Sequence, residues 1–473
     1  MKKRRFFCLF SVAVLLAISC IQPIQGEGAD NISVTEGCNT IDAQKPLDES
    51  GLILETSKAA IVYDRASDTL IYAWNPDMRI YPASMVKLMT ALVAWENSDF
   101  SQMTTVTKTA LGSVSADAVN VGLKTGEQMS LENMMYCMMV ASANDAAAVI
   151  AEHVGGTQTG FVSMMNQKAQ ELGCTGTNFT NAHGLHDENN YTTVRDVCRI
   201  LSAMLEVPIL KEMFGTVRYT VPATNSSASR TVGTTNYMMS SNISQKYYDE
   251  RVTGGRTGST DEAGRCLAIT AEGNDMDLIC IVMGAEHVYE ENTNLILSFG
   301  SFEEMAVLLD HVLDKYEMRN VFYGGQAIAQ YPVTNGVNGL SVEPAEQIAT
   351  VIPIEMELDK LSWTTSNLNM ELRAPVKKGQ HIASMEVWYG SICLAVTDLL
   401  AMHDVSDVQT YSEAIRYTKL DNPGSWTGLI IVIGVIVGIG LILLAAGAVT
   451  RVVRTLRIRI RRRRRRMERR RNR

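Results

Sequence analysis

Ser84 and Lys87 stand three positions apart, in the only SxxK sequence of the chain. Residues i and i+3 of a helix share a face, so a helix here would hold the serine hydroxyl beside the lysine amine. A serine hydroxyl is a poor nucleophile until a neighbouring base takes its proton. A partly desolvated lysine has a lowered pKa and can be that base. We therefore predict that Ser84 is a nucleophile and that Lys87 is its general base.

Ser142 and Asn144 form a second motif, an SxN triplet. A hydroxyl at such a site can relay a proton to a leaving amine, and an amide can hold the backbone of a peptide substrate. The triplet alone is a weak signal, because SxN recurs at Ser240-Ser241-Asn242.

The third motif is Arg256, Thr257 and Gly258, with Ser259 next in the chain. A cation and a hydroxyl on a strand beside the nucleophile could bind a terminal carboxylate. Gly258 would let the backbone approach the substrate closely. A Lys124-Thr125-Gly126 triplet comes too early in the chain for this role, and we interpret it as a solvated loop.

In this order the three motifs resemble those of the serine penicillin-recognising enzymes. The flanking sequences narrow the resemblance to the D-alanyl-D-alanine carboxypeptidases among the low-molecular-mass penicillin-binding proteins. The resemblance spans residues 47–406. The supporting stretches are residues 81–85, 142–146, 181–185, 257–264 and 372–380.

The resemblance implies an α+β fold of the β-lactamase and transpeptidase type, with an antiparallel sheet and a helical subdomain, followed by a small all-β domain. It implies that Ser84 attacks the carbonyl between the two terminal D-alanines of a peptidoglycan stem peptide. Lys87 would be the base, and Ser142 would pass a proton to the departing D-alanine. Asn144 and residues 256–259 would bind substrate, and the backbone N–H groups of Ser84 and Ser259 would form an oxyanion hole. β-Lactams would acylate Ser84. The resemblance implies no cofactor and no metal.

Two positions depart from the family's usual pattern. Arg256 stands where the family usually has lysine; it keeps the charge and can bind a carboxylate bidentately, but it cannot yield a proton. Ala143 stands where glycine is usual. Two other interpretations stay open: a β-lactamase, and a catalytically weak, membrane-tethered wall-binding protein of the same fold. No segment like the deacylating ExxxN sequence of class A enzymes lies between the second and third motifs, which disfavours the β-lactamase.

Hydrophobic patterns predict the elements that must position these residues. Ser130 is a predicted N-cap for one long apolar helix reaching Glu152. After residue 320, strand-like segments predict a small β module: 348–356, 368–372, 382–388 and 391–396. Elsewhere we expect strands at 59–63, 70–74, 267–270 and 278–283, a buried helix at 84–95 and an amphipathic helix at 303–316.

Charge is segregated along the chain. Residues 1–26 carry +4, residues 451–473 hold 14 Arg and one Glu, and the rest carries −25. The N-terminus has the basic and apolar regions of an export signal; a retained anchor helix and a lipoprotein signal ending at Cys20 stay open. Residues 426–450 contain no charge and are long enough to span a bilayer, and the arginine-rich tail that follows favours a cytoplasmic C-terminus.

These observations predict the following organisation: a signal peptide at 1–26, a leader at 27–46, a carboxypeptidase domain at 47–318, a small β domain at 319–406, a juxtamembrane link at 407–425, a transmembrane helix at 426–450 and a basic tail at 451–473. The catalytic domain would lie outside the cell membrane. A hydrophobic content of 46% with 11 Pro excludes a disordered or collagen-like protein.

Seven cysteines remain after the predicted signal peptide, at scattered positions and without a CxxC pair. This spacing disfavours a structural zinc site. His183 and His186 are spaced like a ligand pair but lack an evident third ligand. Cys137 and Cys280 stand among apolar residues, which predicts buried thiols.

Overall fold

The computed structural model describes residues 40–289, 296–366, 372–410 and 412. The predicted signal peptide, membrane span and basic tail lie outside these residues, as do most of the leader and of the juxtamembrane link. Within the described ranges, no helix is both long enough and apolar enough to cross a bilayer. The described chain divides into two compact units, and every candidate site residue lies in the unit whose first stretch ends at Gln326.

A five-stranded antiparallel sheet forms the centre of this unit, with the strand order β2-β1-β9-β8-β7. The four predicted strands are confirmed as parts of β1, β2, β8 and β9. The third motif lies in β7, which is an edge strand, so one side of its backbone faces away from the sheet. The bounds are β1 Ala59–Asp64, β2 Thr69–Trp74, β7 Val252–Thr260, β8 Gly264–Gly273 and β9 Met276–Ala285.

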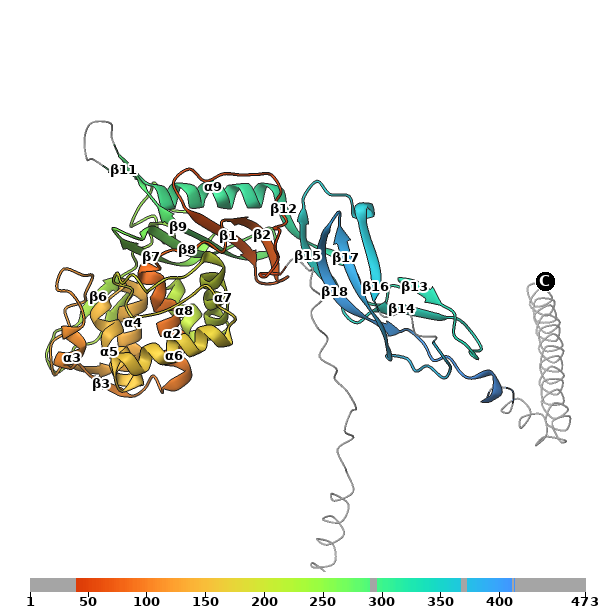
Figure 1. Ribbon diagram of the computed structural model, residues 1–473, viewed down its shortest axis with the longest axis horizontal. Coiled ribbons are helices and arrows are strands. Elements are labelled where there is room, and N and C mark those ends of the chain that lie inside the picture. The colour runs from red at the N-terminus through yellow and green to blue at the C-terminus, as the bar shows by residue number, and fades with distance from the viewer. Residues whose placement is uncertain (1–39, 290–295, 367–371, 411, 413–473) are drawn as a thin grey trace, which may run out of the picture. The chain divides into compact units, whose positions relative to one another are not determined.

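Helices cover both faces of the sheet (Figure 1). Helix α9 (Gly300–Lys315) packs on β8 and β9 from one side, and it confirms the predicted amphipathic helix. Helix α7 (Val194–Leu205) packs on β1 and β9 and leads into the helical subdomain on the other side. Because both faces are covered, all six residues of β1 are buried. The antiparallel sheet with a helical subdomain agrees with the α+β fold that the resemblance implies.

The helical subdomain differs from the prediction at the second motif. Ser130 is the N-cap expected, and its hydroxyl accepts the Asn133 N–H at 3.2 Å. The helix that it begins, α4 (Leu131–Ala141), ends eleven residues later, and a separate helix α5 (Asn144–Gly155) follows. The prediction of one helix reaching Glu152 is wrong, because Ser142 adopts a left-handed conformation with φ of 61° that stops the first helix.

The remaining helices include the turn that holds Ser84. Ser84 lies in a short 3-10 turn, η1 (Ala83–Met85), which leads directly into the buried helix α2 (Val86–Asn97). The others are α3 Lys108–Gly112, α6 Gln158–Glu171, α8 Pro208–Gly215, and the 3-10 turns η2 Tyr237–Met239 and η3 Leu358–Lys360. Short antiparallel pairs are formed by β3 Met103–Thr105 with β4 Gln128–Ser130, β5 Arg218–Val221 with β6 Arg230–Gly233, and β10 His287–Tyr289 with β11 Ile296–Phe299.

Beyond α9 the described chain consists mainly of strands, as predicted. A second five-stranded sheet has the order β13-β14-β18-β17-β16, and β12 pairs with β15. The predicted strand at 368–372 falls almost entirely outside the described residues. The bounds are β12 Tyr316–Phe322, β13 Ala329–Tyr331, β14 Leu340–Pro344, β15 Ile348–Pro353, β16 Leu361–Ser366, β17 His381–Tyr389 and β18 Ile392–Ala401.

Five described cysteines are buried free thiols: Cys137, Cys174, Cys198, Cys266 and Cys280. The prediction for Cys137 and Cys280 is confirmed. Burial raises the pKa of each of these two thiols to about 12. They are therefore protonated and inert near neutral pH.

Candidate active site

Ser84 and Lys87 meet at the junction of η1 and α2. The Lys87 Nζ lies 2.8 Å from the Ser84 Oγ. The lysine side chain is fully buried, whereas Ser84 is partly exposed. The i to i+3 spacing thus brings amine and hydroxyl into hydrogen-bond contact, with the hydroxyl on the accessible side.

Lys87 has two further partners, and both are acceptors. Its Nζ donates to the Asn144 Oδ1 at 2.8 Å and to the His183 carbonyl oxygen at 2.5 Å. The Asn144 amide is oriented by its Nδ2, which donates to the Val119 carbonyl at 3.0 Å. A neutral amine has two N–H groups, and these two acceptors take both. Its lone pair is then directed at the remaining partner, the Ser84 hydroxyl.

The surroundings of Lys87 favour this neutral form. Burial lowers the pKa of the Lys87 ammonium well below its usual value, and the nearby positive charge of Arg256 lowers it further. The Asp145 carboxylate acts in the opposite direction. Burial is the main reason that the pKa of His183 falls to about 4, so this imidazole is neutral near pH 7.

Ser142 reaches Ser84 from the break between α4 and α5. Its Oγ donates to the Ser84 Oγ at 3.0 Å, and its side chain is buried. A non-glycine residue in the left-handed region carries backbone strain, and such residues concentrate at functional sites. Ala83, next to Ser84, is a second residue with positive φ, at 46°.

Arg256 is buried behind these two serines, without a carboxylate among its hydrogen-bond partners in the described chain. Its Nε donates to the Ser84 carbonyl at 2.8 Å, and one terminal nitrogen donates to the Met139 carbonyl at 2.9 Å and the Met138 carbonyl at 3.2 Å. The other terminal nitrogen donates to the Ser142 Oγ at 3.1 Å. By these hydrogen bonds Arg256, which lies in β7, connects this strand to η1, to the end of α4 and to Ser142. Burial lowers the pKa of its guanidinium to about 9, which leaves it charged at pH 7.

The rest of the third motif lines the edge of β7. A Cβ atom on Gly258 would lie 2.9 Å from the Ser84 backbone nitrogen, so glycine is needed for the strand to approach Ser84 this closely. The Thr257 hydroxyl lies 2.5 Å from the Thr235 hydroxyl. Ser259 is exposed. The structure thus brings all eight predicted site residues to one region, along the junction of β7 with the helical subdomain.

Three contributors were not predicted. His183 acts through its backbone carbonyl on Lys87, and Gly184 lies so close that a Cβ atom there would be 1.9 Å from the Ala83 oxygen. The sequence 181–185 supports the family resemblance. A histidine at position 183, however, does not indicate that its backbone carbonyl will accept a hydrogen bond from Lys87. No sequence motif indicated Thr235. Asp145 has a structural role, because its oxygens accept the backbone N–H groups of Val121 at 3.2 Å and Leu123 at 3.0 Å.

No three histidine, cysteine or acidic side chains converge as a metal site in the part of the chain that the structure describes. His186 lies instead against the Tyr81 ring, with 4.7 Å between centroids, and its Nδ1 is 3.7 Å from the Glu262 carboxylate.

The chain is similar to known proteins in sequence and in fold. The sequence model described as D-alanyl-D-alanine carboxypeptidase matches residues 49–287, and that of the C-terminal domain of penicillin-binding protein 5 matches residues 316–407. The D-alanyl-D-alanine carboxypeptidase DacF of Bacillus subtilis is 27% identical over 358 residues, which are 74% of this chain and 86% of that protein. DacA of Haemophilus influenzae is 28% identical over 371 residues, 76% of this chain and 87% of the relative. The crystal structure of penicillin-binding protein 5 from Haemophilus influenzae has a TM-score of 0.61 at 26% identity, and it covers 76% of this chain and all of that one.

Proposed function

This chain belongs to the D-alanyl-D-alanine carboxypeptidase family, and from that premise we propose that Ser84, Lys87 and Ser142 carry out its peptide hydrolysis through an acyl-enzyme. The chain is a serine peptidase that acts on D-Ala-D-Ala termini. The observation that supports these residue roles is the environment of Lys87, whose two other partners are acceptors and whose pKa is depressed.

In the first step the neutral Lys87 amine takes the Ser84 proton as the Ser84 Oγ attacks the carbonyl carbon between the two D-alanines. The carbonyl oxygen becomes an oxyanion, which the backbone N–H groups of Ser84 and Ser259 would stabilise. Gly258 supports this role, because it allows β7 to pass close to the Ser84 nitrogen.

In the second step the C–N bond breaks, and the departing amine receives the proton that Lys87 accepted in the first step. Ser142 is suited to pass it on, since its hydroxyl contacts the Ser84 Oγ at 3.0 Å. The terminal D-alanine leaves and the acyl ester remains on Ser84. A water molecule, deprotonated by the same lysine, then attacks the ester, and the proton returns to the Ser84 oxygen as the shortened peptide is released.

Asn144 and the third motif would bind the substrate. A peptide can add to the free edge of β7 by backbone hydrogen bonds, as in other strand-addition complexes. The substrate carboxylate would lie toward Thr257 and the positive charge of Arg256. Arg256 has five N–H groups and already contacts four acceptors, so it would attract the carboxylate mainly by its charge.

The chain's ends support a membrane-anchored enzyme outside the cell. The uncharged residues 426–450 would form a single span, and the 14 Arg of residues 451–473 would keep the tail in the cytoplasm. Residues 1–26 would be the export signal. The protein would then be an exported carboxypeptidase that is bound to the membrane by its C-terminus. It would trim stem peptides and be acylated by β-lactams.

A fluorescent penicillin tests the chemistry directly. The wild-type protein should be labelled covalently, and Ser84→Ala should not be labelled, because it lacks the nucleophile. Release of D-alanine from a peptide ending in D-Ala-D-Ala should be lost in the same variant. Absence of label on the wild-type protein would contradict the acyl-enzyme. Rapid hydrolysis of the antibiotic without D-alanine release would favour a β-lactamase instead.

A further inference from the structure

Cys393 differs from the other described cysteines. It lies near the start of β18, its side chain is fully buried, and its sulfur is part of a disulfide bond. The five other cysteines that the structure describes are free thiols. None of them is therefore the partner of Cys393, and the partner must be a cysteine outside the described residues.

Three cysteines lie outside the described residues: Cys8, Cys20 and Cys38. Cys8 and Cys20 belong to the proposed export signal at residues 1–26, which would be removed from the mature chain. Cys38 is the one of the three that stays in the exported protein. The odd number of cysteines in the mature chain then consists of one bonded pair and five thiols.

The first described residues limit the region that Cys38 can reach. Cys38 precedes Thr40 by two residues, so the Cα atoms of these residues are at most about 7 Å apart. Arg195, a buried residue of α7, donates to the carbonyl oxygens of Ile41 and of Ala43, the latter at 3.2 Å. The chain that directly follows Cys38 is therefore attached to the carboxypeptidase domain.

The same N-terminal segment continues along β2, toward the strands that hold Cys393. The Leu47 N–H donates to the Leu70 carbonyl of β2 at 2.9 Å. Strand β2 lies against β15, and the Thr350 hydroxyl of β15 donates to the carbonyl of Leu394, next to Cys393, at 3.3 Å. All of these residues belong to one compact unit of the chain. Direct contacts thus connect the N-terminal segment, through β2 and β15, to the strand that contains Cys393.

We propose that Cys38 and Cys393 form a disulfide bond, which links the two ends of the carboxypeptidase region covalently and stabilises its fold. The bond forms when the two thiols lose two protons and two electrons. The oxidant is the exchangeable disulfide of a thiol oxidoreductase outside the cytoplasm, which is reduced to a dithiol. Such bonds persist in exported proteins, because the surroundings are oxidising.

The burial of Cys393 determines the kind of disulfide. Reduction requires a thiolate to reach one of the two sulfurs, and the side chain of Cys393 has no exposed surface. The bond should therefore resist reduction while the protein is folded, as a structural disulfide does. It should also stabilise the enzyme, because a crosslink between residues far apart in the chain restricts the unfolded state.

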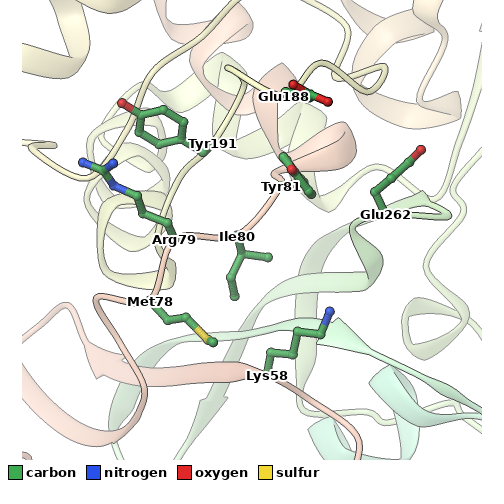
Figure 2. Close-up of a pocket in the computed structure, with 8 residues that line it drawn as sticks. All are labelled: Lys58, Met78, Arg79, Ile80, Tyr81, Glu188, Tyr191 and Glu262. Carbon is green, nitrogen blue, oxygen red and sulfur yellow. The ribbon is translucent and has the colours of Figure 1, made fainter.

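The proposed bond is separate from the catalytic residues. Figure 2 shows a pocket whose lining includes Tyr81, three residues before Ser84, and Glu262, three residues after Ser259. Neither a cysteine nor a residue of the 40–48 segment lines this pocket. Loss of the bond should therefore lower stability and leave the acylation of Ser84 unchanged at low temperature.

Counting thiols in the full-length exported protein tests the pairing. The protein is isolated in denaturant with an alkylating reagent, and its mass gives the number of modified cysteines. The wild-type protein should carry five before reduction and seven after it. Cys38→Ser should carry six in both cases, because it frees Cys393. Cys174→Ser, which removes a free thiol, is the matched control and should carry four before reduction and six after it.

A protease digest should also release two peptides that are joined through Cys38 and Cys393 and that separate on reduction. Seven modified cysteines in the unreduced wild-type protein, or a bond from Cys393 to Cys8 or Cys20, would overturn the pairing. The pairing rests on the proposed removal of the export signal and not on catalysis. Penicillin labelling and D-alanine release at low temperature test the proposed hydrolysis separately.

Heating tests the stabilising role of the bond. Cys38→Ser should lose penicillin labelling at a temperature about 5 °C below that of the wild-type protein. With a reductant present during heating, the two proteins should lose it at the same temperature, because the bond is then broken in both. Equal temperatures in the absence of reductant would overturn the stabilising role.

Discussion

In the proposed mechanism, the charge state of Lys87 decides whether Ser84 can react. An ammonium cannot accept a proton, so the rate of acylation should fall as pH drops through the pKa of Lys87. Burial sets that pKa well below the usual lysine value, which extends the active range toward neutral pH. The positive charge of Arg256 contributes in the same direction, and Asp145 opposes it.

Replacing Arg256 tests this coupling. Arg256→Ala removes a positive charge near Lys87, so the pKa of Lys87 should rise and the ascending limb of the pH–rate profile should move to higher pH. Arg256→Lys retains a charge and should move it less. The measurement is the rate of penicillin acylation against pH. A limb that stays in place in Arg256→Ala would contradict the coupling, and unchanged D-alanine release in both variants would refute a role in carboxylate binding.

At this scale the sequence predicts which residues meet, but not all that they contact. The contact between Ser84 and Lys87 follows from helical spacing alone. The partners of Arg256 do not, because three of them are backbone carbonyls, which every residue type possesses. The same holds for the His183 carbonyl that accepts from Lys87.

At the scale of elements, the site is a junction of η1, the break between α4 and α5, and the edge of β7. The apolar, methionine-rich run after Ser130 favours one long helix, and its side chains give no sign of an interruption. The break is imposed by tertiary contacts. The Val119 carbonyl, from outside the helix, accepts from the Asn144 N–H, while the Ser142 N–H closes α4 locally on the Cys137 carbonyl. The strands of the central sheet were predictable, since apolar segments separated by polar turns mark them directly.

Close packing at Gly184 should make this junction intolerant of a single methyl group. Gly184 and Gly173 both have positive φ, 87° and 71°, but a Cβ on Gly184 would be 1.9 Å from the Ala83 oxygen, whereas Gly173 has nothing within 4 Å. Gly173→Ala should cost about 1 kcal/mol of unfolding free energy from backbone strain alone. Gly184→Ala should cost about 3 kcal/mol, because overpacking is added.

Denaturant unfolding measures the two free energies, and penicillin labelling shows the effect on the site. Gly184→Ala should also slow acylation, since it displaces the residue next to Ser84. Equal stability of the two variants would show that the 183–184 segment can move away from η1 without cost.

At the scale of the whole molecule, charge is separated along the chain. The region between the proposed signal and the tail carries −25, while its substrate is a carboxylate. Such a body offers no long-range attraction to an anion. Recognition must come from a local cation, and Arg256 is the one that lies beside Ser84 and Ser142.

Removing residues 426–473 tests the proposed anchor. The full-length protein should sediment with membranes, and the truncated protein should be recovered in the soluble exported fraction with its penicillin labelling unchanged. Replacing residues 426–450 by an unrelated apolar span is the control and should restore sedimentation. Truncated protein that still sediments would place the anchor elsewhere, with a retained N-terminal helix or a lipid at Cys20 as the alternatives.

The reactivity of the five buried thiols can report which part of this enzyme unfolds. Cys137 lies in α4 and Cys198 in α7, whereas Cys266 and Cys280 lie in β8 and β9. A thiol reagent reaches each of them only when its surroundings unfold, because a buried, protonated thiol does not react. Helical subdomain and sheet can therefore be followed separately as they come apart, without the introduction of any foreign label.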